Sequence, residues 1–283
     1  MLVTGAGRGI GRAIALKLAA GGWDVTAGVR RLEDAPVGPR ISAVRLDITD
    51  AADVAALETA LPAQLDGVVN NAGIVVGGPV EVVPLDDLRH QLEVNVIGQV
   101  AVTQAVLPRL RASKGRVVFI SSVSGRIATP MTGGYSASKF ALEGLADSLR
   151  REVSPWGIGV VLVEPAQTET DIWTRSEEML DSELGRLSPE HKRLYLGHIE
   201  GWRRTIPKSL KLARPAEECA AVVLKALTAP KPKARYVVGT APRVQATLAG
   251  LLPTSVLDAV LRKDRGVPKV VPPAAVQPTT ASE

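Results

Sequence analysis

The segment Thr4-Gly5-Ala6-Gly7-Arg8-Gly9-Ile10-Gly11 follows a short apolar run and opens an amphipathic stretch with helical spacing. Glycines at a turn from strand to helix let the backbone approach a phosphate group, and the N–H groups and dipole of the helix attract its charge. The spacing of Gly5, Gly9 and Gly11 is G-x3-G-x-G rather than the more common G-x-G-x-x-G. The segment predicts a dinucleotide site, although such a turn could also merely join a strand to a helix.

Apolar runs of strand length alternate with amphipathic stretches from the N-terminus to about residue 239. Most of the runs are rich in Val and Ile, which is typical of strands buried on both faces of a parallel sheet. Strands are expected at residues 2–3, 24–29, 41–46, 67–69, 115–120, 159–163 and 235–238. Helices are expected at residues 9–20, 53–61, 84–110, 137–153 and 216–227. Asp50 and Asp53 are placed to cap the second helix, and Pro215 to stand in the first turn of the last. The pattern predicts an α/β fold, a doubly wound sheet of seven parallel strands with helices on both faces.

Composition excludes several classes of protein. The 283 residues include 46% apolar and 22% charged side chains, so a wholly disordered or collagen-like chain is excluded. The single cysteine, Cys219, cannot form an intrachain disulfide, no metal site is expected, and a reducing, cytoplasmic compartment fits best. No uncharged apolar run approaches the ~20 residues of a membrane span, and no signal peptide is expected. The net charge of +5 is dispersed and suits an anionic ligand, whereas the basic stripe of a nucleic-acid-binding protein is missing.

The end of the second expected strand indicates which dinucleotide is preferred. An NAD-binding unit places an acid about 20 residues beyond its glycines, on the ribose 2′-hydroxyl. Val29 leaves that position neutral, whereas Arg30 and Arg31, together with Arg8, could meet a 2′-phosphate through charge-assisted hydrogen bonds. This favours NADP(H), with NAD(H) as the alternative. The arginines could also form a solvated surface patch.

Four further motifs follow in order along the chain: Asn70-Asn71-Ala72-Gly73, Val94-Asn95-Val96, Ile120-Ser121-Ser122-Val123-Ser124-Gly125 and Tyr135-Ser136-Ala137-Ser138-Lys139. With the glycine-rich segment they resemble the short-chain dehydrogenase/reductase family over about residues 2–240. A lone Y-x-x-x-K means little, but Ser122 precedes Tyr135 by the family's usual interval. The resemblance implies a Rossmann-like single domain, a nicotinamide cofactor and the oxidoreduction of an alcohol or a carbonyl.

The residue chemistry leads to the same reaction. Tyr135 and Lys139 are four residues apart and share one face if a helix begins here. An ammonium beside a phenol stabilises the phenolate, so Lys139 should lower the pKa of Tyr135 from about 10 and make it a usable general acid/base. Ser122 would donate a hydrogen bond to the reacting oxygen. By resemblance, Lys139 also contacts the nicotinamide ribose, and Asn95, in a kinked helix, links Lys139 to solvent through water. Each of these residues taken singly could be an ordinary packing or surface residue.

Further cofactor contacts follow from the resemblance. Asp47 is placed to bond the adenine amino group, or else to cap a helix. Thr168 or Thr170 could bond the carboxamide, next to Ala166, where the family commonly has glycine. Contacts with the cofactor are thus expected at Gly5, Gly7, Arg8, Gly9, Ile10, Gly11, Arg30, Arg31, Asp47, Ile48, Asn71, Ala72, Gly73, Tyr135, Lys139, Pro165 and Thr168.

Residues 171–213 interrupt the alternation and are expected to form a substrate lid, or else a peripheral helical pair on the sheet edge. They hold an unusual share of the ring side chains, namely Trp173, His191, Tyr195, His198 and Trp202. Apolar and aromatic linings favour a hydrophobic substrate, and resemblance leans to steroids, retinoids or fatty alcohols. The alternatives are a 3-oxoacyl-acyl-carrier-protein reductase and a non-catalytic NADP(H)-sensing scaffold.

The expected organisation is a catalytic domain at residues 1–240, a helical extension at 241–264 and a disordered, Pro-rich tail at 265–283. The amphipathic stretch at 244–261, interrupted at Pro253, packs near the substrate entrance or touches a membrane surface. No integral membrane contact is expected. Family members usually associate through the helices expected at 84–110 and 137–153, which implies a homodimer or homotetramer.

Overall fold

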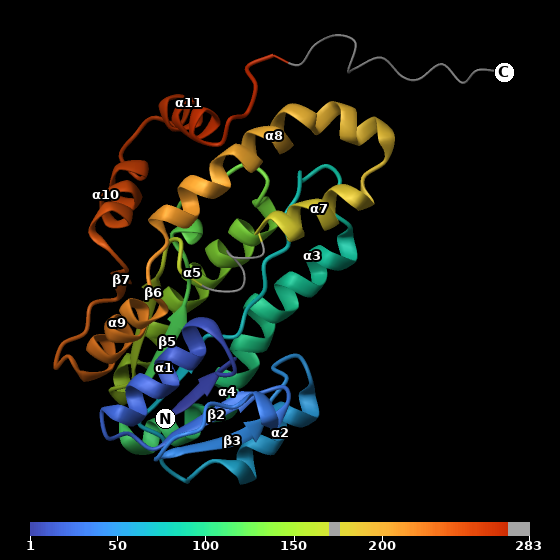
Figure 1. Cartoon of the computed structure of the whole chain (residues 1–283). Coiled ribbons are helices and arrows are strands. Elements are labelled where there is room, and N and C mark those ends of the chain that lie inside the picture. Colours follow the sequence, from blue (N-terminus) through green and yellow to red (C-terminus); the bar gives the residue numbers. More distant parts are fainter. Residues whose placement is uncertain (170–175, 271–283) are drawn as a thin grey trace.

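The computed structural model describes residues 1–169 and 176–270 (Figure 1). Seven parallel strands form one sheet in the order β3-β2-β1-β4-β5-β6-β7. Their bounds are β1 (Leu2–Thr4), β2 (Val25–Val29), β3 (Ile41–Arg45), β4 (Gly67–Asn70), β5 (Arg116–Ile120), β6 (Gly159–Glu164) and β7 (Arg235–Val237). The predicted doubly wound, Rossmann-like sheet is confirmed, and every strand lies within one residue of its expected bounds.

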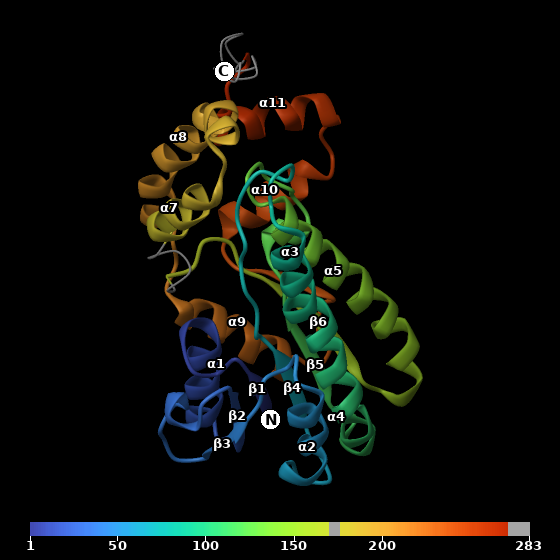
Figure 2. The same ribbon diagram turned by 90° about the vertical axis from the view of Figure 1, so that its right-hand side faces the viewer.

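Helices cover both faces of the sheet (Figure 2). One face carries α1 (Gly9–Ala20) and α9 (Ala216–Thr228), which pack against each other. The other carries α2 (Ala51–Ala60), α4 (Gln99–Ser113) and α5 (Gly133–Val153). The two cores that result explain why the strands are apolar at consecutive positions. In β5, Val117 and Phe119 belong to one core and Val118 and Ile120 to the other, as the period of two requires.

The strand order places a crevice between β1 and β4. Val3 of β1 pairs with Ala27 of β2 on one side and with Val69 of β4 on the other. The chain proceeds outward from β1 through β2 to β3, and then returns to build the other half of the sheet from β4. Ligands of such sheets bind outside the carboxyl ends of the strands at this switch point. The glycine-rich segment after β1 lies there.

The helix expected at residues 84–110 is divided. It consists of α3 (Leu85–Leu92), one π-helical stretch, η2 (Glu93–Gly98), and α4. A π-helical turn inserts a residue and bends the helix locally, and such turns are frequent at functional sites. Asn95 lies within η2, so the kinked helix that the resemblance implied is present.

Three local expectations need correction. Helix α5 begins at Gly133, earlier than the expected residue 137, so Tyr135 lies in its first turn. Asp50 caps α2 by accepting from the Ala52 amide, but Asp53 instead accepts from the Asp47 amide and pairs with Arg45. Pro215 occupies the N-cap of α9, one position before the first turn.

The described part of the segment at 171–213 is a helical pair, α7 (Ser176–Arg186) and α8 (Pro189–Leu212). Ser188 caps α8 by accepting from the His191 amide at 3.1 Å. The pair extends beyond the sheet, above its strands in both views, rather than along a sheet edge (Figures 1 and 2). Trp173 and Thr170 lie outside the described residues, and the role of the pair as a lid stays a prediction.

The expected C-terminal extension is helical, as α10 (Thr240–Ala249) and α11 (Thr254–Asp264), with the break at Pro253. The tail was expected to be disordered from residue 265, and the structure describes its first residues, up to residue 270. Gly266 packs against Gly201 of α8: a Cβ on Gly266 would lie 2.8 Å from the Gly201 Cα. Pro268 lies against Gly197 of the same helix. Residues 271–283 are outside the described part. No helix among residues 1–169 and 176–270 is long and apolar enough to cross a membrane.

Candidate active site at the carboxyl ends of the strands

The glycine-rich turn after β1 leaves no room for side chains. Gly5 has φ +63°, and a Cβ on it would lie 2.9 Å from the Ala72 Cα. A Cβ on Gly11 would lie 2.2 Å from the Gly5 carbonyl oxygen and 2.4 Å from the Asn71 Nδ2. Helix α1 starts at Gly9, and its N-cap residue, Arg8, makes no side-chain capping bond. The first turn of α1 therefore lacks a side-chain cap, which is the arrangement that binds a pyrophosphate.

A buried threonine joins the two sides of the crevice. The Thr4 hydroxyl accepts hydrogen bonds from the amides of Asn71 and Ala72, each at 3.0 Å. The Asn71 Nδ2 returns bonds to the carbonyl oxygens of Thr4 at 3.0 Å and Gly5 at 3.2 Å. A Cβ on Gly73 would lie 3.2 Å from the Asn95 Oδ1. Asn71, Ala72 and Gly73 thus line the crevice as expected, and sequence reasoning missed the role of Thr4.

The arginines after β2 surround an acid. Arg31 holds Asp34 in a bidentate pair, with both N···O distances at 3.0 Å. This hydrogen bond from Arg31 holds the pKa of Asp34 below its usual value, and the charges of Arg30 and Arg8 act in the same direction. Asp34 also lies under the glycine-rich turn, since its Cβ is 3.1 Å from the position of a Cβ on Gly7. The three arginines gather near one place, as expected, but sequence reasoning overlooked the acid among them, which the i,i+3 spacing to Arg31 could have indicated.

Asp47 forms a local turn after β3. Its Oδ1 accepts from the Thr49 amide at 3.0 Å and from the Thr49 hydroxyl at 2.7 Å. The backbone hydrogen bond from Thr49 lowers the pKa of Asp47. The N-cap of α2 is Asp50, so the capping alternative for Asp47 is wrong. Ile48 is buried beneath Gly98, and the adenine contact of Asp47 stays a prediction.

Ser122 and Tyr135 meet near the end of β5. Ser122 is buried, and its hydroxyl accepts from the Ser124 amide at 3.0 Å. Its side chain is also a polar neighbour of the Tyr135 phenol that lowers the pKa of this phenol. Burial raises the pKa of Tyr135, and Ser122 acts against that rise. The pair predicted to face the reacting oxygen is therefore assembled.

Lys139 lies one helical turn beyond Tyr135 on the same face, as predicted. Its Nζ donates to the Ile120 carbonyl oxygen at 2.8 Å and lies 5.8 Å from the centre of the Tyr135 ring. Burial lowers the pKa of Lys139 to about 8, and the charge of Glu143 opposes this shift. The expected lowering of the Tyr135 pKa does not occur in this structure, because desolvation of the phenolate dominates and the ammonium bonds a carbonyl instead of the phenol oxygen.

Asn95 connects the segment after β4 to α5. Its Oδ1 accepts from the Ile74 amide at 2.8 Å, and its Nδ2 donates to the Ile74 carbonyl oxygen at 2.9 Å and to the Ser138 hydroxyl at 3.0 Å. Asn95 therefore holds the floor of the crevice against the helix of the Tyr-Lys pair. The water link to Lys139 stays a prediction.

The chain after β6 lies beside the Ser122 turn. The Pro165 carbonyl oxygen accepts from the Val123 amide at 3.0 Å. Thr168 is buried, and its hydroxyl donates to the Ala166 carbonyl oxygen at 3.2 Å. Thr168 also forms a β-bridge with Arg214, before α9. Pro165 and Thr168 are thus at the correct end of the sheet for the contacts expected of them.

An apolar cavity of about 50 Å³ lies between the segment after β4, the start of α5 and the pair α7–α8. Trp202 of α8 lies over Gly77, with its Cη2 3.0 Å from the position of a Cβ there. The lining is Gly77, Gly78, Pro79, Val82, Val83, Pro84, Met131, Leu180, Leu184, Arg186, Leu187 and Trp202. Trp202 and the aliphatic residues near it thus line a cavity, whereas Trp173 lies outside the described residues and the role of the cavity as the substrate site stays a prediction.

Comparison with known proteins is consistent with this geometry. A sequence profile described as short chain dehydrogenase matches residues 1–181. The chain is 34% identical to an NADPH-dependent 3-dehydrocapnine reductase of Ornithobacterium rhinotracheale, over 93% of this chain and 96% of that protein. It is 36% identical to retinol dehydrogenase 5 of Mus musculus, over 92% of this chain and 87% of that protein. A crystal structure of a short chain dehydrogenase from Burkholderia cenocepacia in complex with NADP superposes with a TM-score of 0.73, at 25% identity, over 92% of this chain and 95% of that one.

Proposed function

Because the chain belongs to the short-chain dehydrogenase family of oxidoreductases, we propose that it interconverts an alcohol and a carbonyl on a hydrophobic small molecule. The proposal takes NADP(H) as the preferred cofactor and a molecule like a steroid, retinoid or fatty alcohol as the substrate. The observation that carries it is the position of the Lys139 ammonium, one helical turn beyond Tyr135 and 5.8 Å from the centre of its ring, next to the buried Ser122.

The residues at the crevice fit a dinucleotide. The first turn of α1 is without a side-chain cap, and Gly5 and Gly11 stand where a Cβ would collide with backbone. These features support a pyrophosphate held by the backbone of residues 5–11. Asp47 and Ile48 would hold the adenine end, and Asn71–Gly73, Lys139, Pro165 and Thr168 the nicotinamide end. When bound, the cofactor supplies or accepts the hydride.

The roles of the side chains follow from their chemistry. In reduction, Tyr135 donates the proton that the carbonyl oxygen takes up, and Ser122 donates a hydrogen bond to that oxygen as negative charge develops. Lys139, as an ammonium 5.8 Å from the centre of the Tyr135 ring, supplies positive charge near the phenolate that remains, although it does not bond the phenol oxygen directly. Oxidation reverses each transfer, so that Tyr135 accepts the hydroxyl proton. Asn95 positions the helix through Ser138.

Following the absorbance of NADPH with a panel of apolar ketones and aldehydes tests the proposal. Consumption that depends on the carbonyl supports an enzyme. Binding of NADPH without turnover across the whole panel would instead favour the sensing scaffold. Efficient turnover of acyl-carrier-protein thioesters alone would favour the 3-oxoacyl reductase, for which the dispersed net charge of +5 is the supporting feature.

The charge around Asp34 leads to a prediction about cofactor preference. Arg8, Arg30 and Arg31 lie near Asp34, and Glu33 lies 3.7 Å from the Arg31 Nε, so three positive charges face two negative charges there. Replacing Arg30 and Arg31 together by alanine should raise the KM for NADPH by about 10-fold or more, since each charge-assisted bond contributes ~1.5–3 kcal/mol. The KM for NADH, which has no 2′-phosphate, should change by less than about twofold. Steady-state kinetics with both cofactors measures this.

Arg40→Ala is the matched control. Arg40 also forms an exposed ion pair, with Asp24 at 3.0 Å, but it precedes β3 and so lies at the amino ends of the strands, whereas Arg30 and Arg31 follow β2 at the carboxyl ends. Its removal should leave both KM values unchanged. A wild-type preference for NADH over NADPH would contradict the arginine argument.

The cavity leads to a prediction about the substrate. The names of two relatives, a retinol dehydrogenase and an estradiol 17-beta-dehydrogenase of Mus musculus, support an apolar substrate. Trp202→Ala should raise the KM for an apolar ketone by about tenfold, because a buried aromatic contact is lost. Trp156→Ala, which removes a half-exposed indole under Arg111, is the control and should leave KM unchanged. Equal KM values in all three proteins would exclude Trp202 from the substrate site.

Two further expectations remain proposals. A homodimer or homotetramer through α4 and α5 is supported by three exposed apolar side chains on η2 and α5, namely Ile97, Phe140 and Leu145. A reducing, cytoplasmic compartment is supported by the single buried thiol of Cys219.

A further inference from the structure

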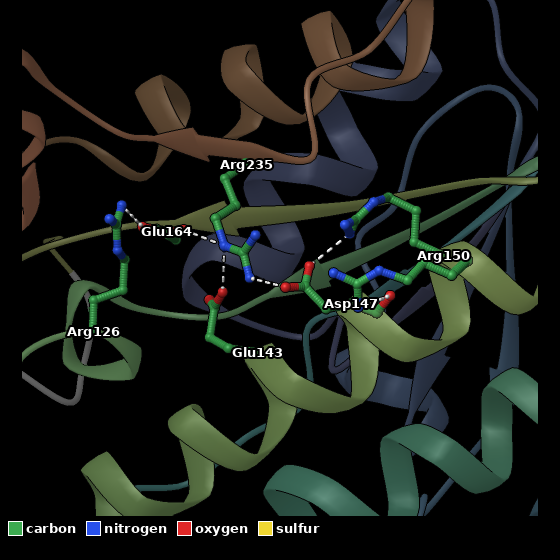
Figure 3. Close-up of polar contacts among 7 residues, drawn as sticks. Arg126, Glu143, Asp147, Arg150, Glu164 and Arg235 are labelled. Carbon is green, nitrogen blue, oxygen red and sulfur yellow. Dashed lines mark hydrogen bonds and ion pairs between the residues drawn. The ribbon is translucent and has the colours of Figure 1, made fainter. Parts of the chain in front are cut away.

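Helix α5 carries four ionisable side chains at intervals of four residues: Tyr135, Lys139, Glu143 and Asp147. Side chains at this spacing stand above one another on one face of a helix. The proposed reaction uses the first two. The other two lie further along the helix, where both contact Arg235 of β7 (Figure 3).

Glu143 is a buried carboxylate directly behind the reaction site. Its Oε2 accepts a hydrogen bond from the Arg235 Nε at 2.8 Å. Its Oε1 has no hydrogen-bond partner among the residues that the structure describes. The Glu143 Cγ lies 3.0 Å from the position of a Cβ on Gly125, so the side chain packs beneath the turn that begins at Ser122.

A second carboxylate shares the same guanidinium. Glu164, fully buried at the end of β6, lies 3.5 Å from the Arg235 Nε and 3.6 Å from the Arg126 Nη1. Within the described chain neither of its oxygens accepts a hydrogen bond. The Nε of an arginine carries one hydrogen, and the shorter distance shows that Glu143 receives it. Glu164 therefore has charge neighbours but lacks the hydrogen bonds that normally accompany a buried carboxylate.

The outer end of the row differs, because it is partly solvated. Asp147 lies 3.0 Å from the Arg235 Nη2 and 2.6 Å from the Arg150 Nη1 (Figure 3). It therefore has two cationic neighbours of its own, and about a quarter of its side chain is exposed. Solvent and these cations screen its charge from Lys139. The charged groups facing the two buried glutamates are thus Lys139 and Asp147 of α5, Arg126 after η3 (Val123–Gly125), and Arg235 of β7.

We propose that Glu143 is a positioning residue that keeps Lys139 protonated during the reaction, and that Glu164 adds a second buried negative charge to the same effect. The significance of Lys139 for turnover rests on the proposed function, whereas the coupling between the charges does not. Three elements of the crevice meet at this cluster: the Ser122 turn through Arg126, the Tyr-Lys helix through Glu143, and the chain leaving β6 through Glu164.

The direction of the effect follows from charge. Burial lowers the pKa of Lys139 to about 8, and the charge of Glu143 raises it. Without that charge, Lys139 would lose its proton nearer to neutral pH. Burial also raises the pKa of Glu164 to about 7, and the charge of Glu143 adds to the rise. Glu164 therefore becomes negative in the range just below the one in which Lys139 titrates. Reduction needs both the ammonium and the protonated phenol, so removal of either negative charge should move its alkaline limit to lower pH.

Titration of ¹³C-labelled lysine by NMR tests the coupling without any substrate. The Lys139 signal is the one that is missing from a Lys139→Met protein. Glu143→Gln should lower the titration midpoint of Lys139 by about one pH unit. A nearby opposite charge shifts a pKa by ~1–3 units, and we expect the lower end of that range. The alkaline limb of kcat/KM for reduction should move by the same amount. Asp147→Asn, which removes a charge from the same helix and the same arginine, should move the midpoint by no more than about 0.3 unit.

A conservative variant separates charge from packing. Glu143→Asp keeps the carboxylate and should restore most of the wild-type midpoint. If Glu143→Gln does not fold, Glu164→Gln tests the electrostatic effect of the buried carboxylates on Lys139. This variant leaves the bond between Glu143 and Arg235 in place. It should lower the Lys139 midpoint in the same direction, by less.

The outcomes distinguish this inference from the proposed function. An unmoved Lys139 midpoint in folded Glu143→Gln would overturn the coupling even where carbonyls are reduced normally. An unmoved midpoint in Glu164→Gln would overturn the part assigned to Glu164. A shifted midpoint in a protein that reduces no carbonyl at all would leave the coupling standing and remove the proposed function instead.

Discussion

Tyr135→Phe should abolish turnover. The substitution keeps the ring on α5, with the Lys139 Nζ 5.8 Å from its centre, and removes only the phenol hydroxyl near Ser122. Since proton transfer by a positioned side chain contributes ~10²–10⁴-fold, kcat should fall by about that factor. Oxidation of NADPH by an apolar ketone, measured under saturating conditions, gives the comparison.

Two measurements show that the loss is chemical. The Kd for NADPH should stay within about twofold of the wild-type value, because an interaction made only in the transition state lowers kcat and not ground-state binding. Ser122→Ala should also lose activity, by about 10²-fold, since it removes one donor to the developing oxyanion. A Tyr135→Phe enzyme that retains wild-type kcat would exclude this tyrosine as the acid/base.

Among substitutions of residues that take no part in proton or hydride transfer, Gly11→Ala should have the largest effect on stability and on NADPH binding. The added methyl group would lie 2.2 Å from the Gly5 carbonyl oxygen, and a backbone atom cannot rotate aside as a side chain can. The glycine-rich turn must then move away from Asn71, which lies 2.4 Å from the same position. We expect a loss of ~1–3 kcal/mol in the free energy of unfolding and the loss of measurable NADPH binding. Thermal unfolding and a fluorescence titration measure the two effects.

Gly144→Ala is the matched control for the same chemical change. Gly144 lies within α5, and a Cβ there would meet no heavy atom within 4 Å. Alanine in place of glycine inside a helix should raise the free energy of unfolding by ~0.5–1 kcal/mol and leave NADPH binding unchanged. If Gly11→Ala binds NADPH as tightly as the wild-type protein, the turn after β1 is not the pyrophosphate site.

The strands could be predicted because local composition determines them. Val117, Val118 and Phe119 are apolar on both sides of the sheet, and such a run has few alternatives to a doubly buried strand. The start of α5 could not be predicted, since it begins with Gly133 and Gly134, which are poor helix formers that only tertiary contacts hold in place. The packing of Gly266 on Gly201 was missed for a similar reason, because glycine offers no apolar side chain to reveal a contact.

The site residues divide in the same manner. Ser122, Tyr135 and Lys139 could be predicted because their spacing carries the chemistry. The pKa of Tyr135 could not, since its direction depends on burial, which spacing does not reveal. Glu143 and Arg235 are 92 positions apart, and no local pattern indicates that β7 carries an arginine to the helix of the Tyr-Lys pair. Asp34 was within reach of sequence reasoning, as the partner of Arg31 at the i,i+3 position.

The bonds of the Thr4 hydroxyl to the amides of Asn71 and Ala72 have a mechanical consequence. They join β1 to the segment after β4, where the two halves of the sheet diverge. A movement of one half relative to the other at this place would break both bonds. The apolar cavity measures only about 50 Å³, whereas pockets for drug-sized molecules span ~300–1,000 Å³. A bulky substrate at this place would therefore have to displace part of the lining, to which α7 contributes Leu180 and Leu184 and α8 contributes Trp202.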